Sequence, residues 1–98
     1  MSKAVSVVIK KSTKPEKKLM AVFKMDTGRT RVTHFGQAGA PDYTRTRDKE
    51  QKSRYLSRHR RRENWDDATS AGALSRWILW DLPTRRASIA SYKKRFNL

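Results

Sequence analysis

The stretch AVSVVIKKSTKPEKKLMAVFKMDTGRTRVTHF, residues 4–35, decides the fold. It contains three runs rich in β-branched and aromatic residues, which are typical of strands. The segments between the runs, TKPEK and MDTGR, contain Pro or Gly and predict turns. Because short turns join antiparallel neighbours, the sequence predicts a three-stranded antiparallel meander.

Side chains of a strand point alternately to the two faces of its sheet, so the pattern also predicts which residues face the core. We expect the inward residues of the first two strands to be Val5, Val7 and Ile9, paired with Leu19, Ala21 and Phe23. In the third strand the pattern leaves two pairs open, namely Val32 with His34 and Thr33 with Phe35. The opposite face is predicted to be rich in lysine.

The rest of the chain predicts a loop and then about three helices, which makes the fold class α+β. The predicted parts of a single basic domain are a β meander over 1–36, a loop over 37–47 and a helical part over 48–98. The first helix is expected near residues 48–62 with Thr46 or Asp48 as N-cap, the second near 70–80, and the third after the N-cap Thr84.

Helical spacing then assigns the faces of these helices. On the first helix, the predicted docking side holds Lys52, Tyr55, Leu56 and His59, and the predicted solvent side holds Arg47, Arg54, Arg58 and Arg61. Spacing places Leu74, Trp77 and Ile78 of the second helix, and Ile89, Tyr92 and Phe96 of the third, against the core. The spacing does not assign Trp80.

Composition excludes several classes of protein. The chain has 98 residues, a net charge of +15 and no cysteine, so it has neither disulfides nor a Cys-based zinc site. The longest apolar run, WILW at 77–80, is far too short to span a membrane, and no signal peptide opens the chain. We therefore expect no membrane association, and the lack of cysteine allows a reducing location, in cytoplasm or nucleus, or the inside of a virion.

The strongest functional signal lies between Arg45 and Arg62, where nine Lys or Arg accompany only Asp48 and Glu50. Such a density is typical of surfaces that neutralise backbone phosphates, because the acids are too few to pair the bases. The residues expected to contact nucleic acid, including those of two further clusters, are Arg45, Arg47, Lys52, Arg54, Arg58, Arg60, Arg61, Arg62, Arg86, Lys93 and Lys94.

Aromatic residues near this run are candidates for stacking on bases, namely Tyr43 and Trp65, whereas spacing assigns Tyr55 to the core. We expect no metal site and no cofactor, because His34 and His59 have no zinc-motif spacing. No phosphate loop or nucleophile elbow is present, so we expect no enzyme. Asp66 and Asp67 are expected to cap the following helix or to pair with arginines.

Four segments, FGQAGAPDYT (35–44), RYLSRHRRRENW (54–65), TSAGALSRWILWDLPT (69–84) and YKKRFNL (92–98), follow one another in a characteristic order. Over these two thirds of the chain the sequence resembles a family of small basic proteins of unknown function encoded by large DNA viruses of algae and other protists. The amino-terminal strands share only general character with that family. The resemblance implies a viral context and supplies no catalytic residues.

The sequence thus predicts a non-enzymatic protein that binds the phosphate backbone of nucleic acid with little sequence specificity. The alternative is a structural component of a large assembly, either a minor capsid or virion core protein or an accessory ribosomal protein. A third hypothesis is an enzyme that acts on nucleic acid, such as a nuclease accessory. The residues leave open whether the polymer is RNA or DNA, single or double stranded, and whether an acidic protein binds the basic residues instead.

Overall fold

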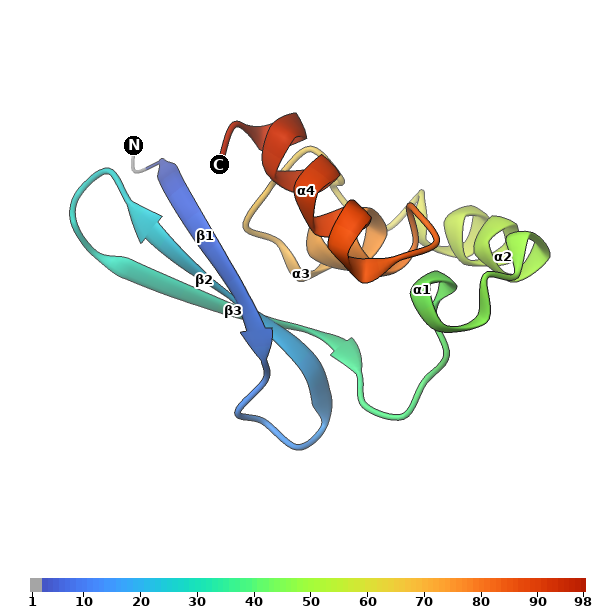
Figure 1. Cartoon of the computed structure of the whole chain (residues 1–98). Coiled ribbons are helices and arrows are strands. Elements are labelled where there is room, and N and C mark those ends of the chain that lie inside the picture. Colours follow the sequence, from blue (N-terminus) through green and yellow to red (C-terminus); the bar gives the residue numbers. More distant parts are fainter. Residues whose placement is uncertain (1–2) are drawn as a thin grey trace.

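A computed structural model describes residues 3–98 and places a sheet beside a group of helices (Figure 1). The sheet contains β1 (Ala4–Lys11), β2 (Lys17–Met25) and β3 (Thr30–Gln37). The strands are antiparallel in the order β1-β2-β3, which confirms the predicted meander.

The register of the sheet decides which side chains face the helices. Leu19 lies opposite Phe35, and Ala21 lies opposite Thr33, so the inward pair of β3 is Thr33 with Phe35. Val7 and Ile9 lie on the expected face, opposite Phe23 and Ala21. The prediction for Val5 is wrong, because the register shifts between Ala4 and Ser6 and leaves the Val5 side chain 48% exposed. This bulge turns Val5 out of the alternation.

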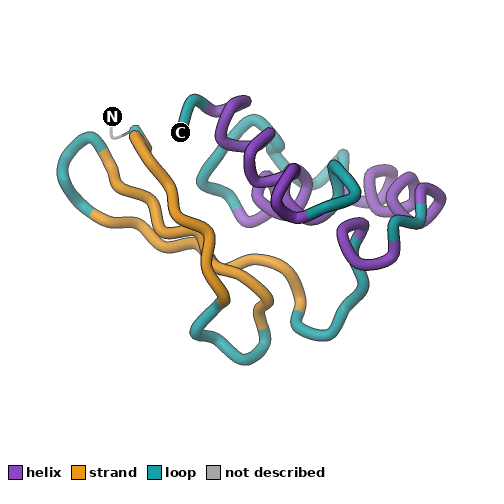
Figure 2. The backbone as a smooth tube through the Cα atoms, in the orientation of Figure 1, coloured by secondary structure: helices purple, strands orange, loops and turns teal. Residues whose placement is uncertain are grey.

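The helical part begins with α1 (Tyr43–Thr46) and α2 (Lys49–His59) and continues with α3 (Ala71–Leu74), the π-helical turn η1 (Ser75–Leu79) and α4 (Arg85–Phe96) (Figure 2). The sheet followed by helices confirms the α+β class. The short helix α1 corrects the predicted loop at 37–47, and it forms there because the Asp42 carboxylate accepts a hydrogen bond from Thr44 N, 3.0 Å away.

Side-chain caps explain where most of the helices begin. Asp48 caps α2 by accepting from the backbone N–H groups of Glu50 and Gln51, and Thr84 caps α4, as the sequence predicted. The helix α2 ends at His59, before the predicted Arg62, and residues 60–62 form turns. The expectation for Asp66 and Asp67 is wrong, because Ser70 caps α3 and Asp67 accepts from Thr69 within the preceding loop. Within residues 3–98 neither carboxylate forms an ion pair with an arginine.

The predicted helix at 70–80 departs from α geometry in its second half. The Trp80 N–H donates to the Ser75 carbonyl five residues back, over 3.1 Å, which defines the π turn. A wider turn changes which side chains point inward. Ile78, Leu79 and Trp80 are consequently all buried, whereas Trp77, expected in the core, is only partly buried beside it.

The core lies between one face of the sheet and the helices α3, η1 and α4. Phe23 and Phe35 of the sheet, Leu74 and Ile78 of α3 and η1, and Tyr92 of α4 are almost fully buried there. The helix α2 lies at one end of the molecule, away from most of the sheet (Figure 1). Most side chains of α2 are therefore at least partly exposed, and Tyr55 is its buried residue. No helix within residues 3–98 is long and apolar enough to cross a bilayer.

Candidate nucleic-acid interface

The arginines of α1, α2 and the turns that flank α2 form an exposed cationic surface. We call it the arginine surface, and its members are Arg45, Arg47, Arg54, Arg58, Arg60, Arg61 and Arg62. All seven side chains are exposed. Arg54 and Arg58 lie one turn apart on α2, which confirms their predicted solvent side. Arg47 lies at the left-handed C-cap of α1, and Arg61 lies in the turn after α2, so both extend the surface beyond α2.

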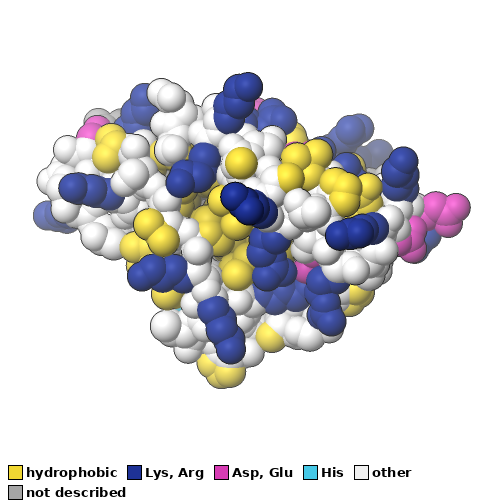
Figure 3. Space-filling view, in the orientation of Figure 1, with side chains coloured by type: hydrophobic (Ala, Val, Ile, Leu, Met, Phe, Trp, Pro, Cys, Tyr) yellow, Lys and Arg dark blue, Asp and Glu magenta, His cyan; other side chains and the backbone are white. Residues whose placement is uncertain are grey.

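Within residues 3–98 no acidic side chain forms an ion pair with the arginine surface. The ion pairs of this part of the chain join Lys18 and Arg85 to Asp42, Arg76 to Asp81 and His59 to Glu63. Asp48, one of the two acids inside this run, caps α2. One view of the whole molecule shows Lys and Arg side chains spread over it, with Asp and Glu showing in only a few places (Figure 3). The arginine surface therefore carries positive charge that the described chain does not pair.

Two predicted contact residues face inward instead. Lys52 donates from its ammonium to the Asp81 carbonyl at 2.6 Å, and the same ammonium lies 4.9 Å from the ring centroid of Tyr43. Tyr43 is only 5% exposed, so its ring offers no face for a base to stack on. Lys52 thus links α2 both to α1 and to the segment after η1. Neither Lys52 nor Tyr43 is part of the arginine surface.

Trp65, the other predicted stacking residue, belongs to a cluster of indoles and guanidinium groups. Its indole N–H donates to the Glu63 carboxylate at 3.0 Å, and the Arg76 guanidinium lies 5.3 Å from its ring centroid. Arg76 and Arg95 also lie over the ring of Trp77, at 4.2 Å and 3.6 Å. These contacts hold α4 against η1 and leave the half-buried Trp65 on the edge of the fold.

The three basic residues predicted on the last helix are exposed, but they are not all near the arginine surface. The helix α4 runs from the side of α1 toward the amino-terminal end of β1 (Figure 1). Arg86 lies in its first turn and is therefore on the side of α1, whereas Lys93 and Lys94 lie in its last turn. The structure thus separates Lys93 and Lys94 from the predicted group.

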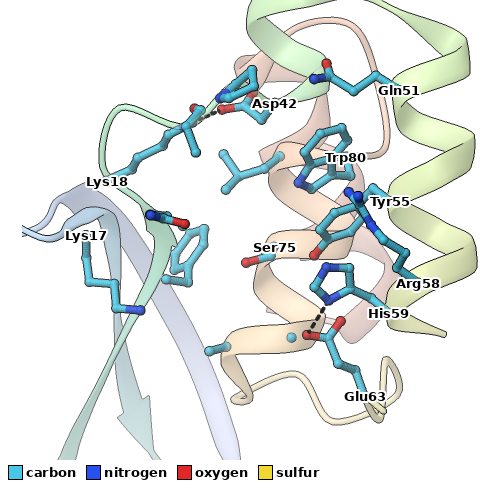
Figure 4. A pocket seen from close by; sticks show the side chains of 18 residues that line it. Lys17, Lys18, Asp42, Gln51, Tyr55, Arg58, His59, Glu63, Ser75 and Trp80 are labelled. Atoms are coloured by element: carbon cyan, nitrogen blue, oxygen red, sulfur yellow. Dashed lines mark hydrogen bonds and ion pairs between the residues drawn. The ribbon is translucent and has the colours of Figure 1, made fainter. Parts of the chain in front are cut away.

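A cavity of about 440 Å³ lies beside the arginine surface, and sequence reasoning missed it. Its walls come from the end of β3, the loop before α1, the inner side of α2 and the helices α3 and η1, which are far apart in the sequence (Figure 4). Only Arg58 belongs both to these walls and to the arginine surface. Proline and glycine in the segment 36–41 indicated an irregular loop, but nothing in the sequence indicated a hollow.

Three stacked rings form one wall of this cavity. The Tyr55 ring lies between those of His59 and Trp80, with centroid separations of 4.1 Å and 4.3 Å. The Tyr55 side chain reaches toward Ser75 across the cavity wall (Figure 4). Burial raises the pKa of Tyr55, so its hydroxyl stays protonated and can donate. The wall therefore combines apolar ring edges with polar atoms.

The ion pair between Lys18 and Asp42 neutralises part of the charge around the cavity. Lys18 donates to the Asp42 carboxylate at 2.6 Å, and His59 Nδ1 lies 3.3 Å from the Glu63 carboxylate. Burial alone raises the pKa of Asp42, but its hydrogen bonds from Lys18 and Thr44 and the charges of Lys18 and Arg85 outweigh burial and hold that pKa below the ordinary range. Asp42 is thus ionised at neutral pH.

Neither His34 nor His59 belongs to a group of metal ligands within residues 3–98. Within residues 3–98, His, Asp and Glu side chains nowhere gather in a group of three that could hold a metal ion. His34 Nδ1 lies 2.7 Å from the Ser12 hydroxyl, at the far side of the sheet from His59.

The fold and the surface define a small α+β protein with an exposed, unpaired arginine surface beside a cavity lined by both polar and apolar side chains. The chain belongs to a family of unknown function, DUF5754, whose model matches residues 7–59, more than half of its length. The match runs from within β1 to the end of α2, so it includes most of the sheet and omits two of the four segments on which the resemblance rested, residues 69–84 and 92–98. Neither a curated protein nor a solved structure matches the chain.

Proposed function

We propose that this protein binds nucleic acid without catalysing a reaction, and that the arginine surface neutralises the phosphate backbone. The observation that carries this proposal is the group of seven exposed arginines that form no ion pair with carboxylates of the described chain. Guanidinium groups bind phosphate oxygens through two parallel hydrogen bonds, which favours arginine over lysine in such a surface.

The arginine surface supplies positive charge but no recognition helix that could contact specific bases. Its members come from α1, α2 and the turns after α2, so they follow no single groove-reading helix. Contacts of this kind position a protein on the backbone but carry little sequence information. We therefore expect weak sequence preference, and both RNA and DNA are used as ligands in the test.

The dependence of affinity on salt tests the proposal. If about six of the arginines contact duplex phosphates, log Kd should change with log salt concentration by a slope of magnitude about 5, because each contact releases condensed counterions. The double variant Arg54→Ala with Arg61→Ala should reduce that slope by about 2 while leaving the fold unchanged, since both side chains are exposed.

A matched control removes two exposed cations elsewhere. The double variant Lys14→Ala with Arg29→Ala also removes two positive charges, but it removes them from the segments that join the strands. We expect its slope to stay within experimental error of the unchanged protein. A slope near zero for the unchanged protein, or an equal loss in the control, would contradict the proposal.

The second candidate function is that of a structural component of a large assembly. It is favoured by a row of valines on the sheet face turned away from the helices, where Val8, Val22 and Val32 lie opposite one another in register. Val8 and Val32 are 54% and 46% exposed, as apolar contacts between proteins require. If the isolated chain fails to unfold cooperatively until other proteins of its particle are added, this function is supported. The viral origin and the location in a host cell or virion remain parts of these proposals.

A further inference from the structure

We propose that the cavity beside α2 receives one unpaired nucleotide of the strand that the arginine surface holds. This inference rests on the proposed function and names the part of the nucleic acid that the cavity would recognise. The cavity volume of about 440 Å³ lies within the range of pockets that bind single small molecules. Its position places it against the arginine surface, because Arg58 contributes to both.

The charges at the cavity fit a phosphate at its entrance. Lys18 is paired with the Asp42 carboxylate at 2.6 Å, so it adds little net charge, and His59 Nδ1 lies 3.3 Å from the Glu63 carboxylate. Lys17 and Arg58 are exposed, line the cavity and form no ion pair within residues 3–98. The unpaired charges of Lys17 and Arg58 favour an anionic group at the entrance of the cavity. Because Lys18 is already paired with Asp42, the interior favours a neutral group.

The inner wall fits the edge of a base. Trp65 and Trp77 donate their indole N–H groups to protein oxygens, at 3.0 Å and 2.9 Å, whereas the indole nitrogen of Trp80 faces the cavity (Figure 4). Ser75 lines the same space with a hydroxyl, and Gln51 lines it with an amide whose oxygen accepts from the Thr46 hydroxyl at 2.9 Å and whose NH2 group has no such partner within residues 3–98. Donors and acceptors of this kind bind the hydrogen-bonding edge that an unpaired base exposes.

The π turn explains why these groups meet. Its wider register brings Ser75, Leu79 and Trp80 to the cavity together, and π turns inside helices are frequent at functional sites. The backbone of β3 approaches η1 closely at Gly36, where a Cβ atom would lie 2.8 Å from a Leu79 methyl carbon. A nucleotide inside the cavity would therefore lie against walls that are fixed by packing.

The proposal is tested with two short duplexes that differ in a single unpaired adenosine, made in DNA and in RNA, and with adenosine 5′-monophosphate. We expect the duplex with the unpaired adenosine to bind about tenfold more tightly than the fully paired one, from the added base contacts. Adenosine monophosphate should shift the indole N–H resonance of Trp80 in NMR spectra, and inorganic phosphate should not.

Two pairs of variants separate the cavity from the rest of the protein. Trp80→Phe keeps a ring in the stack but removes the indole N–H, and it should abolish the tenfold preference, whereas Trp77→Phe should preserve it. Arg54→Ala and Arg58→Ala each remove one cation from α2, but only Arg58→Ala should weaken the binding of adenosine monophosphate.

The outcomes are distinguishable. Salt-dependent binding of both duplexes with equal affinity, without binding of adenosine monophosphate, would overturn the inference and leave the proposed function standing. If neither duplex binds in a salt-dependent manner, the proposed function fails and the inference fails with it. Displacement of adenosine monophosphate by an acidic peptide but by neither duplex would also overturn the inference, since the occupant would then be a protein.

Discussion

At the scale of the residue, Asp42 joins three parts of the fold. Its carboxylate caps α1, pairs with Lys18 of β2 at 2.6 Å and lies 3.9 Å from a guanidinium nitrogen of Arg85 at the start of α4. The Asp42 side chain is 1% exposed, so its charge depends on these partners. The chain has only nine acidic residues, and this one is used to hold the sheet to the helices.

Asp42→Asn should destabilise the protein by about 3 kcal/mol, because it leaves Lys18 without its buried partner. The folded-state pKa of Asp42 lies below its ordinary value of 3.8, so its contribution to stability is fully present above that value. The contribution is lost as pH falls from 3.8 through the folded pKa. Urea unfolding at neutral and acidic pH measures both effects.

The exposed Asp66 supplies the control, and we expect Asp66→Asn to change stability by less than about 0.5 kcal/mol. Equal losses in the two variants would show that Asp42 has no special contribution.

At the scale of the element, the contact between β3 and η1 determines the shape of the candidate site. Gly36 has a φ of +78° and lies against Leu79, so it meets both a backbone and a packing requirement. Gly39, three residues later, has a nearly equal φ of +79° but open space around its α-carbon. Comparing the same substitution at the two glycines therefore separates the cost of backbone strain from the cost of crowding a neighbour.

Gly39→Ala should cost about 1 kcal/mol from the left-handed backbone alone. Gly36→Ala should cost about 2–4 kcal/mol, because the added methyl group also crowds Leu79. Thermal unfolding followed by circular dichroism measures the difference. Equal costs at the two positions would mean that β3 and η1 adjust to the added methyl group without strain.

At the scale of the whole molecule, the net charge of +15 on 98 residues governs both stability and binding. The radius of gyration of 13.1 Å brings these charges close together, and their mutual repulsion opposes folding. A ligand that binds only the folded state stabilises it by mass action. A polyanion should therefore stabilise the fold while it neutralises the charge.

Polyphosphate at about 100 times its Kd should raise the midpoint of thermal unfolding by about 10–20 °C. Sodium chloride at the same ionic strength should give a smaller rise, because it only screens the repulsion. Replacing Arg54 and Arg61 by Ala should reduce the polyphosphate effect. Differential scanning fluorimetry measures all three, and a lower midpoint in polyphosphate would contradict this account.

The sequence alone determined the meander, the α+β class, the cap Thr84 and the exposure of Arg54 and Arg58, and it narrowed the cap of α2 to Thr46 or Asp48. These features depend on residues that are close together in the chain, through alternation, helical spacing and local hydrogen bonds. They were predictable because local geometry gives each of them one favourable arrangement. The excess of arginine over acid was likewise readable without any structure.

Only the tertiary structure decided where the side chains of Lys52, Tyr43 and Val5 lie. It alone also decided that a π turn and a cavity form. Lys52 meets Asp81 across 29 positions of sequence, and no local pattern predicts that contact. The register shift at Val5 and the π turn each insert a residue into a periodic element, and packing selects where such an insertion occurs. The cavity arises where the sheet, α2 and η1 meet without filling the space, which is a property of their arrangement and of no single segment.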